Sequence, residues 1–249
     1  MPSNKKLLQA AAGSAGGESL YVEDVFSTYL YTGNGSTQTI TNGIDLAGEG
    51  GLVWTKARSV SYSHDLFDTD RGIKSGLRTN DTSAAATTAA NAGFSSFNSD
   101  GYSIAGPFGG FGSLNVNNVT HASWSFRKAE KFFDVVTWTG NGAGTRTVAH
   151  NLGVLPGMII VKRTDSTSDW LTYNSNGSLY KQMSLNSTAA NNSDKNYSEI
   201  ATDSTLDVAH MEGSIGIGNA NGATYVAYLF ASDAGGFGDD EDENIIKCG

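Results

Sequence analysis

The stretch FFDVVTWTGNGAGTRTVAHNLGVLPGMIIVKR, residues Phe132–Arg163, indicates the fold of this chain. Two apolar runs suited to β-strands, Val135–Trp138 and Met158–Val161, flank a turn rich in glycine and asparagine. Short apolar runs bounded by such turn residues are typical of strands. An earlier stretch, Phe26–Arg58, has the same features in the same order.

The similarity between the two stretches extends along most of the chain. The sequence YLYTGNG at Tyr29–Gly35 matches VTWTGNG at Val136–Gly142, and LVWTK at Leu52–Lys56 matches MIIVK at Met158–Lys162. Matched residues keep a nearly constant separation, which predicts a tandem duplication. Each copy has about a hundred residues, a normal size for a domain with its own core.

The expected fold class is all-β, with two tandem antiparallel β-sandwich domains and a short N-terminal helix. Glycine is abundant (31 residues) and proline scarce (3 residues), a composition that favours many short strands joined by turns in a sandwich or barrel. The expected segments are a docking helix and linker at 1–19, repeat one at 20–131, repeat two at 132–238, and at 239–249 an acidic linker with what resembles the start of a third repeat.

Charge and composition exclude several classes of function. The formal net charge of −9 gives a surface that repels phosphate, so we expect no nucleic-acid partner. The single cysteine, Cys248, excludes an internal disulfide framework. No apolar run reaches membrane-spanning length and Met1–Gly17 lacks a signal-peptide core, so we expect synthesis in the cytoplasm and no membrane insertion.

The sequence contains a dense carboxylate cluster, Asp65, Asp68 and Asp70, followed by Gly72. Carboxylate oxygens are ligands that calcium prefers, which makes these aspartates calcium candidates although they do not match an EF-hand loop. The alternative is that they pair with Arg71. The histidines lack metal-ligand spacing, and neither a hydrolase nucleophile elbow nor a phosphate-binding loop occurs. We therefore expect no enzyme activity, no catalytic residues and no cofactor apart from the calcium candidate.

Four aromatic residues lie in or beside polar loops of the second copy. A flat apolar ring beside hydrogen-bonding groups suits a sugar, so these residues are candidates for glycan contact. The alternative is that Trp170 and Tyr173 alternate along a strand and point into the core. The four candidates are Trp170, Tyr173, Tyr180 and Tyr197.

Several motifs resemble a family of repeated β-sandwich domains in virion and tail-fibre proteins of tailed bacteriophages, especially marine phages. The motifs are Tyr31–Gly35 (YTGNG), Gly43–Leu46 (GIDL), Ser96–Tyr102 (SFNSDGY), Ser123–Lys128 (SWSFRK) and His150–Arg163. The resemblance covers the chain from about Leu20 to Gly249. It implies a concanavalin-like or jelly-roll sandwich and a structural role in the virion, and it carries over no functional residues.

The expected function is that of a virion structural protein, the virion-proximal part of a tail fibre that presents host-recognition domains. Leu7 and Leu8 on the helix predicted at Ser3–Ala12 would dock into other virion proteins, and a homotrimer is expected because fibres are commonly trimeric. The alternatives are a capsid decoration or head-fibre protein and a carbohydrate-binding module that binds a host surface glycan.

Overall fold

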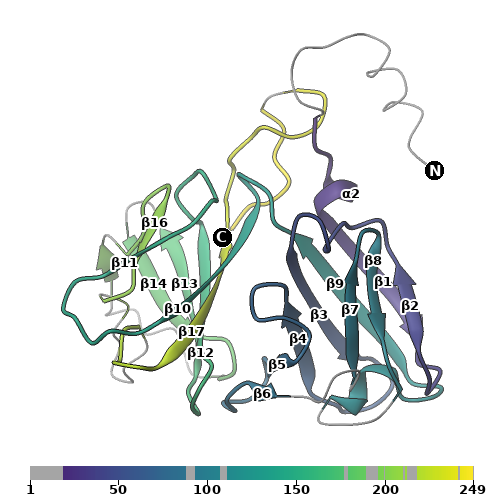
Figure 1. Cartoon of the computed structure of the whole chain (residues 1–249). Coiled ribbons are helices and arrows are strands. Elements are labelled where there is room, and N and C mark those ends of the chain that lie inside the picture. Colours follow the sequence, from purple (N-terminus) through teal and green to yellow (C-terminus); the bar gives the residue numbers. More distant parts are fainter. Residues whose placement is uncertain are drawn as a thin grey trace.

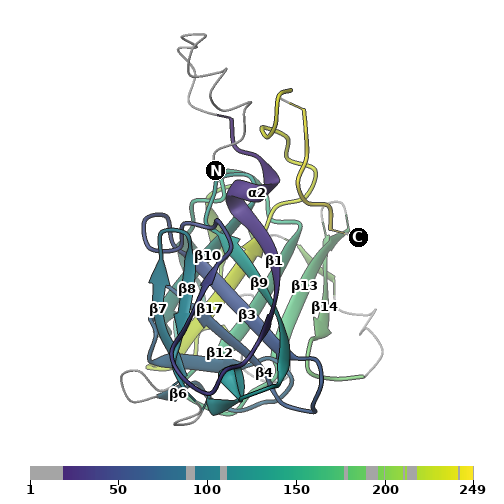
Figure 2. The same ribbon diagram turned by 90° about the vertical axis from the view of Figure 1, so that its right-hand side faces the viewer.

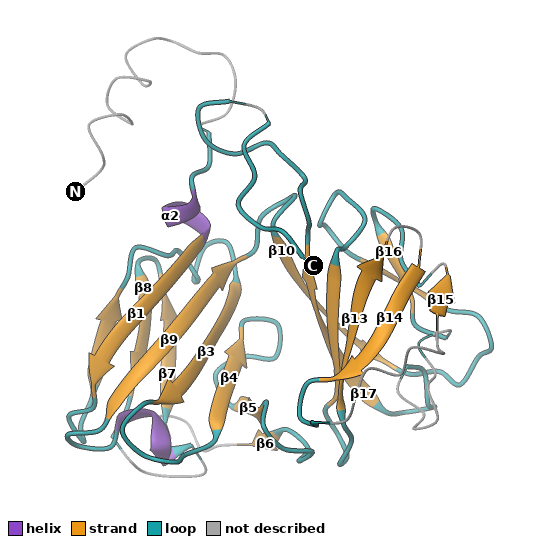
Figure 3. Ribbon diagram, turned by 180° about the vertical axis from the view of Figure 1, so that it is seen from behind, coloured by secondary structure: helices purple, strands orange, loops and turns teal. Residues whose placement is uncertain are grey.

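The computed structural model describes residues 19–87, 93–106, 111–176, 179–188, 196–198, 200–209, 211, 218–240 and 242–248. These residues are almost entirely strands and loops (Figure 3). The helical segments among them are the short helix α2 (Val22–Val25) and a 3₁₀ turn, η1 (Gly112–Asn115). The docking helix predicted at Ser3–Ala12, with Leu7 and Leu8, lies outside the described residues.

A six-stranded antiparallel sheet and a three-stranded sheet form the first half of the chain (Figure 1). The large sheet has the order β1 (Phe26–Thr32), β9 (Thr120–Arg127), β3 (Gly51–Ala57), β4 (His64–Asp68), β5 (Ser75–Arg78), β6 (Ala86–Thr87). The small sheet has the order β2 (Gln38–Thr41), β8 (Gly101–Ile104), β7 (Phe94–Asn98).

The second half of the chain also contains a six-stranded antiparallel sheet, with a two-stranded one beside it. The large sheet has the order β10 (Phe133–Thr139), β17 (Thr224–Phe230), β12 (Met158–Arg163), β13 (Trp170–Asn176), β14 (Leu179–Ser184), β15 (Asn196–Ser198). The small sheet pairs β11 (Thr147–Ala149) with β16 (Thr205–Asp207). The two six-stranded sheets correspond strand by strand, and the predicted all-β class with antiparallel sheets is confirmed.

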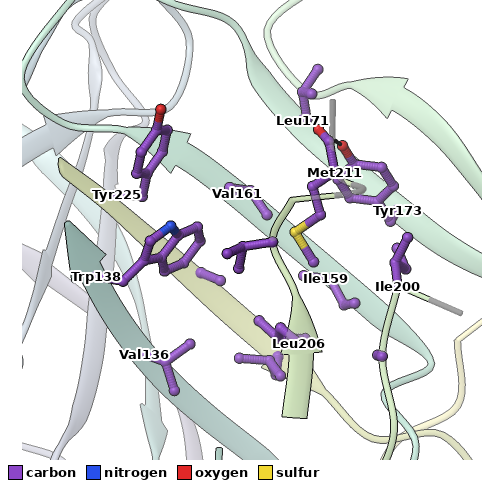
Figure 4. Close-up of a cluster of buried hydrophobic side chains, with 14 of the residues drawn as sticks. Val136, Trp138, Ile159, Val161, Leu171, Tyr173, Ile200, Leu206, Met211 and Tyr225 are labelled. Carbon is purple, nitrogen blue, oxygen red and sulfur yellow. Dashed lines mark hydrogen bonds between the residues drawn. The ribbon is translucent and has the colours of Figure 1, made fainter. Parts of the chain in front are cut away.

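Each half has a core between its large sheet and its small sheet. In the first half this core includes Val53, Phe67 and Tyr102. In the second half Trp138, Ile159, Val161 and Tyr173 belong to the corresponding core, which Figure 4 shows in close-up. Side chains that alternate along a strand point to opposite faces of the sheet, so the remaining apolar positions of these strands face the other way.

A third core lies between the two six-stranded sheets and contains residues of both halves. Leu52 and Leu66 of the first half share it with Ile160, Tyr228 and Phe230 of the second. The strand sequences LVW and MIIVK are apolar on both faces because these central strands are covered by a core on each side. Figure 2 shows the first large sheet lying in front of the second.

Aromatic rings close the third core at one end of the sheets. Phe126 of β9 lies 5.5 Å from Phe133 of β10 and 5.5 Å from Phe230 of β17, measured between ring centroids. A fully buried side chain of this size contributes roughly 1.5–3 kcal/mol through burial. The halves are therefore held together by hydrophobic packing of the kind found inside a domain.

Among the described residues, none of the helices is both long and apolar enough to cross a membrane.

Candidate functional site

Asp65 and Asp70, two of the calcium candidates, have separate partners. Ser113 donates its hydroxyl to Oδ2 of Asp65 at 2.6 Å, whereas Lys128 pairs with Asp70 at 2.6 Å. In the described part of the chain, no three acidic, histidine or cysteine side chains come together as metal ligands. The aspartates thus do not converge on a shared calcium position.

Asp68, the third candidate, belongs to a buried network that joins the two halves. Its Oδ2 accepts hydrogen bonds from Nε of Arg71 at 2.7 Å and from the hydroxyl of Tyr228 at 2.7 Å. Arg71 also donates through Nη2 to the hydroxyl of Tyr228 at 3.1 Å. Tyr228 comes from β17 of the second half, and burial raises the pKa of its hydroxyl. The alternative pairing with Arg71 is what the structure shows for Asp68.

Lys162 forms a second polar connection between the halves. Its side chain is fully buried, and its ammonium donates to the carbonyl oxygens of Ser168 at 2.7 Å and Thr82 at 3.1 Å. The backbone N–H of Ser168 also donates to Thr82, at 2.9 Å. Burial lowers the pKa of Lys162 to about 8. A loop of the first half is thereby fixed to strand β12 of the second.

Three of the four predicted glycan contacts are core residues, so the prediction of a surface platform is wrong for them. Trp170 and Tyr173 are 0% exposed and Tyr180 is 2% exposed. Trp170 donates through Nε1 to the carbonyl of Arg78, and Tyr180 donates its hydroxyl to the carbonyl of Pro156. Alternation along β13 directs Trp170 into the shared core and Tyr173 into the second-half core (Figure 4). The side chain of Tyr197 lies outside the described residues.

Ser113, Asp65 and His121 lie close together in the first half, but not as a nucleophile and its base. The Ser113 hydroxyl donates to Asp65, and both ring nitrogens of His121 face backbone carbonyls, of Val119 at 3.0 Å and Ser113 at 2.8 Å. Burial raises the pKa of Asp65 to about 6 and lowers the pKa of His121. Among the described residues, Oδ1 of Asp65 has no hydrogen-bond partner, and Nε of Arg78 lies 3.9 Å from it. The position matching Asp65 in the second copy is the apolar Leu171.

Both chain segments that flank the sheets meet at one end, which we call the junction end (Figure 1). The N–H of Gly238 donates to the carbonyl of Leu20 at 2.8 Å, and the hydroxyl of Tyr21 donates to Asp239 at 2.6 Å. The link between the halves, Arg127–Lys131, passes through the same end. The chain thus enters and leaves the pair of sheets at one place.

A pocket of about 480 Å³ opens at the junction end, between the link and the two flanking segments. We call it the junction pocket. It is lined by Ser19, Leu20, Glu49, Arg127, Lys128, Ala129, Glu130, Lys131, Gly236 and Phe237. Its lining includes three cations, Arg127, Lys128 and Lys131, and two carboxylates, Glu49 and Glu130.

At the opposite end of the sheets, a buried asparagine contacts the Gly-Asn-Gly turn that occurs in both copies. In the first half, Oδ1 of Asn115 accepts from the N–H of Asn34 at 2.9 Å, and its Nδ2 donates to Oδ1 of Asn34 at 3.2 Å. The side chain of Asn115 is fully buried. We call this arrangement an asparagine clamp.

The second half repeats the asparagine clamp with different residues. Oδ1 of Asn219 accepts from the N–H of Asn141 at 3.0 Å, and its Nδ2 donates to Asn141 at 2.7 Å and to Ala143 at 2.8 Å. A side chain at Gly140 would overlap the carbonyl of Ala220. The Gly-Asn-Gly turns were predicted, but their distant asparagine partners were not, because nothing in the sequence pairs residues so far apart.

A family model described as "Domain of unknown function (DUF7483)" matches residues 22–239. The chain belongs to the DUF7483 family. The match runs from α2 to the segment after Phe237, so a single DUF7483 model covers both six-stranded sheets, the core between them and the link. No curated protein and no solved structure matches the chain.

Proposed function

We propose that this DUF7483 chain is a non-enzymatic structural protein of a tailed-phage virion, the virion-proximal part of a tail fibre. Each half is taken as one antiparallel β-sandwich of the jelly-roll or concanavalin-like type. The proposal is supported by the sequence resemblance at motifs such as Tyr31–Gly35. It is also supported by the buried polar groups, which form hydrogen bonds between the two halves. Asp68, Arg71 and Lys162 all serve to join the halves.

The observation that carries the proposal is that the two halves form one block. They share a hydrophobic core, and the network of Asp68, Arg71 and Tyr228 crosses the same boundary. Two domains on a linker would bend relative to each other, because interfaces between such domains are small and polar. A shared apolar core suits a rigid part that transmits force or holds other domains at a fixed distance from a particle.

The position of the flanking segments gives the block an orientation. Because Leu20 and Gly238 meet at the junction end, we propose that this end faces the particle and that the clamped loops at Asn34 and Asn141 face outward. The partners in this proposal are other virion proteins, contacted through the N-terminal segment, and further copies of the chain in a homotrimer.

One observation favours a second candidate, a capsid decoration or head-fibre protein. Tandem domains along a fibre enter at one end and leave at the other, whereas this chain enters and leaves at the same end. Such a block projects sideways from its attachment point, as a decoration does. Both candidates are virion structural proteins.

The proposal is tested by locating the chain in phage particles. A gene variant that lacks residues 1–18 is compared with the full-length gene, and the chain is measured in purified particles by mass spectrometry and gold-labelled antibody. The full chain is expected on the tail or capsid, and the shortened chain is expected to be lost from particles while it still folds. A chain that never copurifies with particles contradicts the proposal.

A further inference from the structure

Strand β1 forms one edge of the first large sheet (Figure 3). It pairs with β9 on one side, and within the described part of the chain no strand pairs with its other side. The N–H of Gly33, just after β1, donates to the carbonyl of Val119 at 2.8 Å, which fixes the backbone groups that face β9. In an antiparallel pair, residues that bond to the neighbouring strand alternate with residues that do not. The N–H and C=O groups that point away from β9 are therefore those of Thr28, Leu30 and Thr32.

The matching edge strand of the second half, β10, is protected against pairing with another strand. Its outward N–H at Val135 donates to the carboxylate of Asp134 at 2.8 Å, and its outward carbonyl at Thr139 accepts from the guanidinium of Arg146. The residue of β1 that matches Asp134 is the uncharged Ser27. The other edge strands of the described sheets have five residues or fewer, whereas β1 has seven. Charged side chains and short edge strands are means by which native sheets prevent edge pairing, and β1 has neither.

The composition of β1 suits a second copy of the same strand. Leu30 is 58% exposed, the largest value among the exposed large apolar side chains described, and the second half has Thr137 at the matching position. The strand sequence FSTYLYT carries no charge, although the chain has a net charge of −9, so two copies can approach here without repulsion between like charges. The sequence TYLYT at Thr28–Thr32 also reads the same in both directions. Such a sequence presents identical pairs to an antiparallel copy of itself.

We propose that β1 pairs with β1 of a second copy, antiparallel and about a two-fold axis at Leu30. Leu30 then lies opposite Leu30 of the second copy, and each Thr28 lies opposite a Thr32. Each of these pairs exchanges two backbone hydrogen bonds, so every outward N–H and C=O of the three residues gains a partner. Cross-strand threonine pairs add to the stability of such a sheet.

This pairing goes beyond the proposed function and does not depend on it. A two-fold contact joins copies in pairs and does not by itself close a trimer, so the homotrimer of the proposed function needs a contact elsewhere. Failure of the pairing would leave the virion role standing.

The test is sedimentation equilibrium of the full chain over a range of concentrations, which is expected to show a reversible dimer. Leu30→Lys places two ammonium groups opposite each other at the axis and is expected to raise the dimer Kd at least tenfold. Because Leu30 is exposed at a sheet edge, circular dichroism should show an unchanged fold. Thr137→Lys makes the same change at the matching position of β10, which is also exposed, and is the control that should leave the dimer Kd unchanged.

Disulfide crosslinking tests the register of the pairing. In a chain with Cys248→Ser, the variant Leu30→Cys places two thiols at the axis, where the Cα atoms of a hydrogen-bonded pair lie about 5.5 Å apart, within the range of a disulfide. This variant is expected to crosslink to itself on oxidation. The variant Thr28→Cys is the control, because its two thiols would lie four residues out of register, roughly 13 Å apart along the strands, and should not crosslink.

Three results would overturn the proposal. The first is a chain that stays monomeric, including one whose amides at Thr28 and Leu30 exchange slowly with solvent because another segment of the same chain covers the edge. The second is a dimer or trimer that keeps its mass in Leu30→Lys. The third is a dimer in which Thr28→Cys crosslinks as readily as Leu30→Cys.

Discussion

Tyr228→Phe removes one hydroxyl from the boundary between the two halves and leaves the ring in the shared core. The hydroxyl donates to Asp68 at 2.7 Å and accepts from Arg71 at 3.1 Å, and Tyr228 is 1% exposed. A hydrogen bond to a charged group contributes about 1.5–3 kcal/mol. Asp68 keeps its pairing with Arg71, so the variant does not leave an uncompensated buried charge, which would cost about 3–5 kcal/mol.

We therefore expect Tyr228→Phe to lower the free energy of unfolding by about 2 kcal/mol, measured by urea denaturation. For a chain of this size, that corresponds to a fall of roughly 4–8 °C in Tm. Tyr180→Phe is the matched control. It removes a hydroxyl bonded to the neutral carbonyl of Pro156 inside the second half, and should cost about 1 kcal/mol.

The same experiment tests whether the halves unfold together. Because the shared core is lost when either half unfolds, circular dichroism and tryptophan fluorescence are expected to show one coincident transition in both the original chain and Tyr228→Phe. The reasoning is refuted if Tyr228→Phe changes stability by less than about 0.5 kcal/mol, the range of ordinary surface substitutions. Two separate transitions, of which only one shifts, would also refute it.

Three further changes have definite expected outcomes. Burial raises the pKa of the Asp65 carboxyl from 3.8 in the unfolded chain to about 6 in the folded chain, so the folded state holds the carboxyl proton more tightly. The contribution of the protonated carboxyl to folding stability is therefore fully present below pH 3.8 and is lost as the pH rises through 6. Asp65→Asn should therefore gain about 3 kcal/mol relative to the original chain between pH 4 and pH 7, and a difference that is flat with pH contradicts this. Asn219→Ala removes three hydrogen bonds of the second clamp and should cost about 2–3 kcal/mol, with faster hydrogen exchange at the amide of Asn141; unchanged exchange would rule the clamp out. Gly140→Ala forces the turn away from Ala220 and should destabilise by more than about 1 kcal/mol in urea denaturation, whereas an unchanged midpoint would show that the turn has room.

The strands could be predicted from the sequence because their signals are local. The apolar runs at Leu52–Lys56 and Met158–Lys162 became β3 and β12, and the repeat appears as the same strand order in both large sheets. Their apolarity on both faces indicates that each is covered twice. It does not indicate that the second face of each large sheet packs against the large sheet of the other half, because a sequence pattern shows that a residue is buried but not which residues bury it.

The site residues were harder to predict because their roles depend on distant partners. Asp68 lies in an acidic cluster that suggests a metal, yet its partner is a tyrosine from the far end of the chain. Trp170 and Tyr173 lie beside polar loops, and only their place on β13 shows that both are buried. The junction pocket could not be predicted from the sequence. Arg127 and Lys131 belong to a short charged link, and the pocket forms only because the two flanking segments fold against that link.

Cryo-electron microscopy of particles that carry this chain tests the proposed virion role most directly. We expect density for both six-stranded sheets packed against each other, with the junction end against the tail or capsid and the clamped loops pointing outward. Particles that lack the chain, or that hold it with the junction end facing solvent, would contradict that role.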